Sequence, residues 1–240
     1  MDPVSPLVNT AYTLLDGNNF MKLYQKAWIY AAHGSELVNG VYFNAGLEYA
    51  ERSALVNTTD YTWVKSSKRR FTSNDPLDPA NEAPAFEKNQ SFMVSFSFRF
   101  RIQQKYISVP DKTIIGSKYP DLTISYLKGI DGFLGSDVDY DVLKIGIDGK
   151  QKLGLFGTLS YRGLYGAFIN NKKMEFMDYH HFNGNRTIFA NFRLSSYQLL
   201  DYYQYSTNKN YLELGAEHHF NGFIFNKLPL IRKTKWKAVG

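Results

Sequence analysis

Residues 91–101 read Ser-Phe-Met-Val-Ser-Phe-Ser-Phe-Arg-Phe-Arg, and this stretch decides the fold. In a β-strand, successive side chains point to opposite faces of the sheet. One face of this strand is therefore entirely apolar, with Phe92, Val94, Phe96, Phe98 and Phe100. The opposite face is mostly small and polar or basic, with Met93, Ser95, Ser97, Arg99 and Arg101. A soluble sheet could bury the first face, but the second is typical of a wall that faces a water-filled lumen.

The same alternation with a period of two residues recurs along the chain. It is found in residues 41–52, 121–126, 143–148, 153–162 and 212–217. We expect about eight strands of about ten residues each, longer than ordinary soluble strands and long enough for a tilted strand to cross a bilayer. The pattern predicts an all-β fold, an antiparallel transmembrane β-barrel, in a single domain that spans residues 1–240.

Charged side chains fall on the polar faces of these predicted strands. Such residues can pair with one another across a polar interior, whereas facing lipid they would be costly. We therefore expect a set of charges to line the lumen: Glu48, Arg99, Arg101, Arg162, Glu213 and Glu217.

Turn signals divide the strands. Asp148-Gly149 predicts a tight turn, and His33-Gly34-Ser35 predicts a second one. Two long polar segments, at about residues 53–89 and 169–208, are expected to be loops at the other end of the barrel. Gly154 and Gly157 are expected inside a strand, where glycine permits bending or close packing.

Two segments fit the alternation less well. Residues 20–32 have a spacing that suits either a strand or an amphipathic helix, and the strand is favoured because the neighbouring segments are strands. Residues 221–237 do not alternate. We expect them to form a short helix or turn at the membrane edge, with Trp236 as an interfacial anchor.

Composition excludes several classes of function. The chain of 240 residues has no Cys, so it has neither thiolate metal ligands nor a thiol nucleophile. No run approaches the ~20 apolar residues that a membrane-spanning helix needs. The net charge of +6 comes largely from residues 227–237, and this local basic segment does not predict nucleic-acid binding.

No motif predicts catalysis or a cofactor. His180-His181 and His218-His219 are adjacent pairs, which in a strand point to opposite faces and cannot chelate one metal together. A Gly-x-Ser-x-Gly nucleophile elbow is absent, and the glycine-containing stretches lack a phosphate-binding pattern. We expect a non-enzymatic protein without catalytic residues, metal or cofactor.

The C-terminal third resembles a known family. The resemblance rests on residues 211–220, 221–233 and 235–236, with weaker similarity in residues 39–58 and 181–185. These stretches resemble a family of large outer-membrane proteins of unknown function that carry an N-terminal carboxypeptidase-regulatory-like domain. The resemblance implies a fragment of that family's barrel, in the outer membrane of a Gram-negative bacterium, with further strands on both sides.

That family is distantly similar to the BamA-like superfamily, whose barrels insert or export other outer-membrane proteins. The resemblance implies outer-membrane lipid and other outer-membrane or surface proteins as partners. It also implies that residues 169–208 match the superfamily's loop that folds into the lumen, although its Arg-Gly-aromatic motif is missing. The loose analogue in this chain is Phe182, Asn183, Gly184, Asn185 and Arg186.

Three hypotheses about function follow. The first is a barrel related to outer-membrane protein assembly or translocation, in which residues 169–208 enter the lumen and contact Arg99, Arg162, Glu213 or Glu217. The second is a passive or substrate-specific outer-membrane channel. The third is a soluble β-sandwich or lipocalin-like binding module, which would stay in solution without detergent.

Overall fold

The computed structural model describes residues 4–64, 71–81, 83–109, 111–188, 194–227 and 238–240. One antiparallel sheet contains seven strands in the order β1-β2-β3-β6-β7-β8-β9, and β4 pairs with β5 in a separate hairpin. The strands are β1 (Tyr24–Val38), β2 (Val41–Ala54), β3 (Asn89–Arg101), β4 (Lys105–Ile107), β5 (Thr113–Gly116), β6 (Asp121–Gly129), β7 (Asp139–Lys152), β8 (Thr158–Lys173) and β9 (Tyr211–His219). The prediction of an all-β antiparallel fold is confirmed.

The helical segments are short. They are the α-helix α1 (Pro6–Asp16) and the 3-10 turns η1 (Phe133–Gly135), η2 (Gly154–Phe156), η3 (Phe176–Asp178) and η4 (Phe225–Lys227). Among the described residues, no helix has the length and apolar character needed to span a membrane. The expected helix or turn in residues 221–237 is thus seen only as η4, because residues 228–237 lie outside the described part of the chain.

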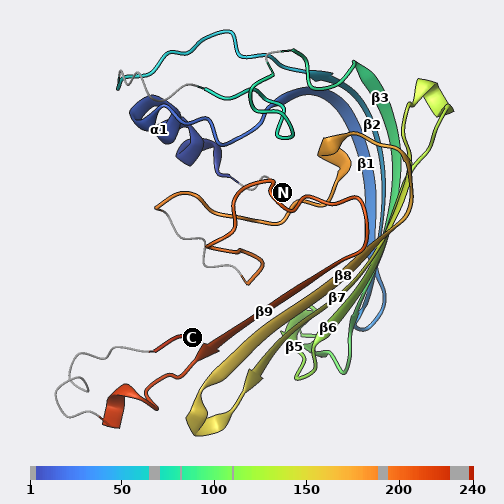
Figure 1. Cartoon of the computed structure of the whole chain (residues 1–240). Helices are drawn as coiled ribbons and strands as arrows, with labels where there is room; N and C mark the ends of the chain where they lie inside the picture. The colour runs from blue at the N-terminus through green and yellow to red at the C-terminus, as the bar shows by residue number, and fades with distance from the viewer. Residues whose placement is uncertain (1–3, 65–70, 82, 110, 189–193, 228–237) are drawn as a thin grey trace.

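The main sheet is strongly curved, and helix α1 and the described parts of the long loops lie on its concave side (Figure 1). The register pairs apolar residues with apolar residues on one face of the sheet, and mostly polar residues with one another on the other face. One row of directly paired residues, from β2 to β9, is apolar throughout: Phe43, Phe98, Ile124, Ile145, Tyr165 and Leu212. The adjacent row on the other face consists of Tyr42, Arg99, Thr123, Gly146, Leu164 and Glu213.

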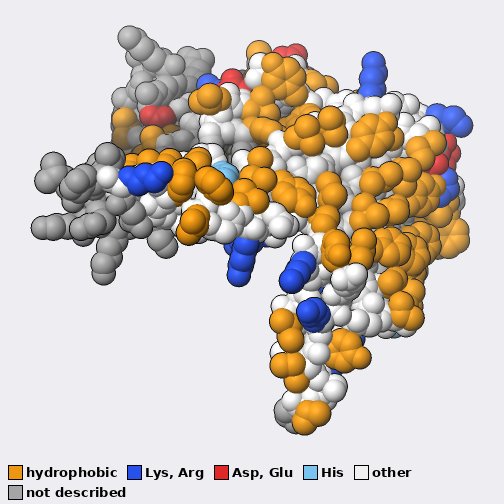
Figure 2. Space-filling view, turned by 90° about the horizontal axis from the view of Figure 1, so that it is seen from below, with side chains coloured by type: hydrophobic (Ala, Val, Ile, Leu, Met, Phe, Trp, Pro, Cys, Tyr) orange, Lys and Arg blue, Asp and Glu red, His pale blue; other side chains and the backbone are white. Residues whose placement is uncertain are grey.

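The apolar face is the convex one, and it is open. Leu212 and Leu214 of β9 keep 60% and 67% of their surface exposed, and Ile29 of β1 keeps 71%. Figure 2 shows hydrophobic side chains gathered over this side of the sheet. The buried core is small by comparison: Val138, Tyr140 and Val142 form its centre, and they pack on the polar side of the sheet against partly buried neighbours that include Met93 and Phe168.

Both predicted tight turns are wrong. Asp148 and Gly149 lie inside β7, where they pair with Arg162 and Tyr161 of β8. The chain reverses instead between Leu153 and Gly157, because Gly154 and Gly157 adopt φ angles of 58° and 109°, which favour glycine. These two glycines therefore form a turn and do not lie within a strand as expected.

The first hairpin turn also differs from the prediction. His33, Gly34 and Ser35 continue β1, where Gly34 pairs with Asn44. The two-residue turn is Asn39-Gly40, with a φ of 84° at Gly40. Asn-Gly is the strongest short hairpin signal, since both residues tolerate a positive φ. Residues 24–32 form a strand, as favoured, although it begins at Tyr24 and not at residue 20.

The predicted long loops are present with shifted boundaries. β2 runs to Ala54 and β3 begins at Asn89, so the first loop covers residues 55–88. β8 continues to Lys173, which moves residues 169–173 from the predicted loop into the strand, and β9 begins at Tyr211. Both loops lie at the end of the sheet opposite the Asn39-Gly40 and Leu153–Gly157 turns (Figure 1).

Tyrosine rings lie directly over glycines in paired positions of neighbouring strands. Gly129 of β6 pairs with Tyr140 of β7, and a Cβ atom at Gly129 would lie 3.0 Å from the Tyr140 ring. Gly166 of β8 pairs with Tyr211 of β9, where an added Cβ would overlap the ring itself. Each glycine is thus required because its side-chain space is filled from the next strand.

The two outer strands of the sheet each have one unpaired edge over most of their length. In the described residues β1 pairs only with β2. β9 pairs with β8, and the end of its other edge is met by the last residues of the chain, where His219 bridges Val239 and His218 exchanges backbone hydrogen bonds with Gly240. A closed barrel is not formed by these strands.

Candidate functional site on the polar face

The six charges that the sequence predicts for a lumen all lie on the polar, concave face. Glu48 of β2 pairs with Met93 of β3, which in turn pairs with Gly129 of β6. Arg99 and Arg101 of β3 lie on the same face as Met93, because all three are an even number of residues apart. Arg162, Glu213 and Glu217 follow the same register on β8 and β9. The alternation in the sequence therefore predicts correctly that these six charged residues lie on the same face of the sheet.

Three of these six charges pair with a Lys or Asp side chain of the same face. Arg101 donates two hydrogen bonds to the carboxylate of Asp121, with Nη2 2.6 Å from Oδ2. Lys26 Nζ lies 2.7 Å from Glu48 Oε1, and Arg162 Nε lies 3.8 Å from Asp148 Oδ1.

Other charged groups on this face stand apart from those pairs. Glu217 contacts His219. Arg99 is exposed and makes no ion pair with any residue that the structure describes.

A covering segment, residues 174–188 and 194–210, runs over the concave side of this face (Figure 1). Its first anchor is a buried ion pair between Asp178 of η3 and Arg52 of β2, in which Nη1 lies 2.6 Å from Oδ1. Arg52 is only 2% exposed, and its Nε donates to Asn89 Oδ1 at 2.8 Å. The hydroxyl of Tyr140 donates to the same Asp178 oxygen at 3.3 Å.

The anchor also shapes the local backbone. Asp178 Oδ2 accepts a hydrogen bond from the backbone N–H of Glu175 at 3.0 Å, which completes a capping box around η3. Burial raises the pKa of Glu175, an effect that the Arg52 charge opposes. The short turn is thereby held at the point where β8 gives way to the covering segment.

A second anchor joins the covering segment to β9. The His180 ring stacks on Tyr211, with centroids 3.7 Å apart and an interplanar angle of 4°. His180 Nε2 lies 2.9 Å from Glu213 Oε1, close enough for an ion pair but outside hydrogen-bonding geometry. The Tyr197 hydroxyl donates to Glu213 Oε2 at 3.5 Å. Of the four wall residues expected to meet this loop, Glu213 is the one that the covering segment contacts directly.

The five residues of the predicted loop motif divide between two directions. Phe182 faces the sheet, edge-on to His180 and Tyr211 at centroid distances of 5.0 and 6.1 Å. Arg186 points elsewhere, with Nε 3.3 Å from Asp201 and its guanidinium 5.6 Å from the Phe20 ring centroid. Between them, the Asn183 carbonyl accepts from the Tyr197 N–H, the Asn185 N–H donates to the Leu200 carbonyl, and the Gly184 N–H donates to the Phe182 carbonyl.

Small polar side chains form a groove on the wall, away from the anchors. A cavity of 460 Å³ is lined by residues that include Asn44, Ser97 and Ser125, which are directly paired across β2, β3 and β6. Lys144 of β7 continues the row. Within the described chain the Lys144 ammonium makes no hydrogen bond or ion pair, so the groove carries hydroxyl, amide and cationic groups that are open to solvent or solute.

The histidines do not assemble a metal site in the described residues, where no group of three or more His, Cys, Asp or Glu side chains is suitably placed. His180 turns toward the wall, while His181 Nδ1 lies 2.7 Å from Ser206 Oγ. His218 Nε2 is 2.8 Å from the backbone oxygen of Phe156. What this site can do chemically is bind and orient charged or polar groups along a wall.

Sequence reasoning missed the Arg52 anchor. Arg52 was recognised as part of the alternation of residues 41–52, but nothing nearby in the sequence marks it as buried. Its partners are supplied by Asn89 and Asp178, which are 37 and 126 residues away. The one available signal is an arginine at the last polar position of a strand, next to a loop rich in carboxylates.

The comparisons identify a family. The model described as "Family of unknown function (DUF5686) C-terminal domain" matches residues 1–240. No curated protein and no solved structure matches the chain.

Proposed function

Because the chain belongs to this family of unknown function, we propose its function from its geometry: it forms part of the wall of an outer-membrane β-barrel that takes part in assembling or translocating other outer-membrane proteins. The protein is non-enzymatic in this proposal. Its convex face contacts lipid, and its concave face lines an aqueous lumen that the covering segment partly occupies.

One observation carries the membrane part of the proposal. A directly paired apolar row crosses six strands from Phe43 to Leu212, and the described chain leaves that face open. A large exposed apolar surface is unfavourable in water and marks a surface that meets lipid or another protein. Strands of up to 16 residues are long enough to cross a bilayer when tilted.

The unpaired edges support a larger barrel. Lipid cannot satisfy free backbone N–H and C=O groups, so a membrane sheet has to close. β1 and β9 are not joined in the described residues. We therefore propose that further strands complete the wall, in agreement with the relationship to the BamA-like barrels inferred from the sequence.

The link to assembly or translocation comes from the covering segment. It is held against the wall at two separated points, by Arg52 and by Tyr211 with Glu213. A segment fixed inside a barrel can contact a passing chain or control the passage beside it. This role is supported by the two anchors and by the resemblance to the BamA-like barrels.

The membrane test uses two adjacent positions on β3. Phe98 faces the convex side and Ser97 the concave side. In the complete protein, Phe98→Lys is expected to cost about 2–4 kcal/mol if position 98 lies near the bilayer midplane, and to reduce insertion into the outer membrane. Ser97→Lys should insert normally. Equal insertion of both variants, or a protein that stays dispersed without detergent, would favour the soluble β-sandwich alternative.

A channel is the second candidate, and a specific observation favours it. The groove of 460 Å³ has Lys144 on its wall, for which the described residues supply no partner, and Arg99 lies exposed on the same face. If the protein is a passive or substrate-specific channel, the reconstituted complete protein should show steady ion conductance, and Arg99→Glu should shift its selectivity toward cations. A closed protein whose segment cross-links to unfolded outer-membrane clients would favour assembly or translocation.

A further inference from the structure

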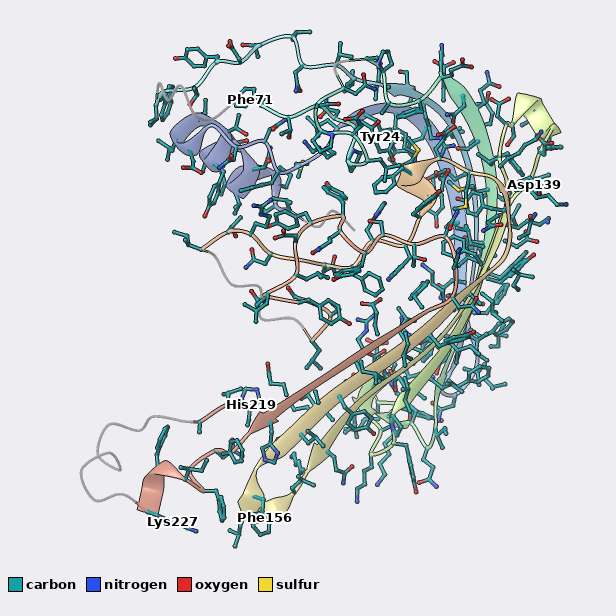
Figure 3. All side chains as sticks on the ribbon, viewed as in Figure 1. Tyr24, Phe71, Asp139, Phe156, His219 and Lys227 are labelled. Atoms are coloured by element: carbon teal, nitrogen blue, oxygen red, sulfur yellow. The ribbon has the colours of Figure 1, made fainter. Side chains whose placement is uncertain are left out.

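A second cavity lies outside the polar wall, at the end of the sheet that carries the long loops. Its volume is 370 Å³, and it is enclosed by residues 22–24, 54–55, 74–77, 85–86, 174–177, 179, 181 and 203. Figure 3 labels Tyr24, which lines it beside η3. Cavities of this size, at the lower end of the range for small-molecule sites, accommodate a molecule of one or two rings.

Six aromatic side chains and two thioethers are among the residues that line the cavity. Phe176 of η3 packs with His181 and Tyr203, at centroid distances of 4.9 and 6.2 Å. Across the cavity, Tyr24 and Phe86 meet edge to face at 6.2 Å. The sulfur-containing side chains of Met174 and Met177 complete the apolar lining. Rings and polarisable sulfur favour contact with another aromatic ring.

The charged groups at the cavity already have partners. Lys22 Nζ donates to Thr72 Oγ1 at 2.5 Å and to the Ser73 backbone oxygen at 2.6 Å. Burial lowers its pKa to about 8, against the opposing attraction of Asp75. Burial also lowers the pKa of His181 to about 4, so this ring is neutral at neutral pH. An additional cation in this cavity would meet the same desolvation penalty.

One polar group remains for a ligand. Tyr179 is one of the residues that line the cavity, and its hydroxyl has no hydrogen-bond partner among the residues that the structure describes. The wall that carries it is fixed in place, because η3 is held by the capping box and by the buried ion pair between Asp178 and Arg52. A preformed wall avoids the cost of ordering it on binding.

We propose that this cavity binds a small neutral aromatic molecule of one or two rings, with one hydrogen-bonding group directed to Tyr179. The apolar lining selects the ring, the partnered charges disfavour an ionic ligand, and the free hydroxyl selects the polar group. This site uses neither the convex face nor the polar groove, but it shares the covering segment with the proposed function. Binding of a small molecule in the cavity is therefore tested separately from membrane insertion.

The experiment uses three probes with the same ring and different charge: indole, tryptamine and indole-3-acetate. Binding to the complete protein in detergent micelles is followed by saturation-transfer NMR at neutral pH, with empty micelles as the blank. Indole is expected to bind saturably, and both charged probes at least about ten-fold more weakly, since burying an unpaired charge is costly. Failure of indole to saturate, or equal binding of tryptamine, would overturn the proposal.

Two variants locate the site. Tyr179→Phe keeps the ring and removes the hydroxyl, and should weaken indole binding about three- to ten-fold. Ala85→Trp places a large ring at the cavity wall and should abolish saturable binding. The matched control is Phe98→Ala on the convex face, which should bind indole as the unmodified protein does. Unchanged binding in both site variants would place the indole elsewhere and refute this cavity as its site.

Discussion

Arg52 and Asp178 stand 126 residues apart in the sequence, yet the guanidinium Nη1 and carboxylate Oδ1 are 2.6 Å apart and both side chains are nearly inaccessible to solvent. The pair connects the last polar position of β2 to the first turn of the covering segment. A buried ion pair adds little net stability over an apolar substitute, but breaking it by removing one partner is costly. The contact therefore serves mainly to define where the segment lies.

Arg52→Met is expected to release the covering segment from the wall. The variant leaves the Asp178 carboxylate buried without its partner, at a cost of about 3–5 kcal/mol. Amide hydrogen exchange of residues 174–188 should become much faster, while exchange in the β6–β8 strands changes little. The matched control is Lys88→Met, which removes an exposed ion pair with Glu51 and should leave exchange unaltered. The double variant Arg52→Met/Asp178→Leu should recover part of the protection.

Glu213→Gln should loosen the second anchor. The substitution removes the carboxylate charge beside His180 while an amide oxygen can still accept from Tyr197, so the expected loss is about 0.5–1.5 kcal/mol. Protease cleavage within residues 194–210 should become faster. Glu217→Gln, four residues further along β9 on the same face and paired with His219, provides the comparison. Equal cleavage of the two variants would show that the His180 stack alone holds this anchor.

Gly166→Ala should destabilise the sheet because its Cβ would overlap the Tyr211 ring. Overpacking of this kind costs about 1–3 kcal/mol. Gly146→Ala is the control in the neighbouring strand, where the nearest heavy atom to the new Cβ is Leu164 Cδ1 at 3.6 Å. Thermal unfolding in detergent should occur at a lower temperature for the first variant only. If both variants unfold alike, the ring has room to move.

Acidification should weaken the packing of the covering segment around His181. Burial, with the neighbouring His180, lowers the pKa of His181 from 6.5 to about 4. Between these values the open segment binds a proton that the packed one does not, so packing is lost as pH falls and is unaffected by this group above about 6.5. Within that window, the opening equilibrium constant, obtained by dividing each exchange rate by the intrinsic rate at the same pH, should rise by up to about ten-fold for each unit that pH falls. His181→Gln should flatten this dependence, and a profile unchanged by the substitution would contradict the prediction.

The strands were predictable because their signal is local. In residues 91–101 and 41–52 every second side chain has the same character, and a sheet with two different environments requires that pattern. When β2 and β3 pair residue by residue, Phe98 lies beside Phe43 and Arg99 beside Tyr42, so each face keeps its own character. For the same reason the predicted charges fall on one face.

The turns were less predictable because glycine has two uses in this sheet. Gly149 looks like a turn residue after Asp148, but it lies within β7 opposite the Tyr161 ring. Gly154 and Gly157 were expected within a strand, yet they supply positive φ at the reversal. Helix α1 was not predicted, although Pro6 near its first turn and Gly17 beyond its end are ordinary helix signals.

The site was only partly predictable because its contacts are distant in sequence. Glu213 was named from its strand position, whereas its partners His180 and Tyr197 depend on how the covering segment folds. Arg186 was expected in a lumen motif, but it is paired with Asp201 inside the segment. Burial of Arg52 could not be read from its neighbours, since the groups that compensate it come from two other parts of the chain.

The placement of Tyr211 over Gly166 has an evolutionary consequence. The Tyr211 ring fills the side-chain space of Gly166 as well as its own. Substitution of only one of the two residues would therefore leave a cavity or cause a steric clash. The two sites should be inherited as a unit: a relative with a bulkier residue at the position of Gly166 should have a smaller one at the position of Tyr211. Gly129 and Tyr140 should covary in the same way. Covariation at these two glycine–tyrosine pairs should therefore identify which strands are neighbours even in relatives whose other strand residues differ.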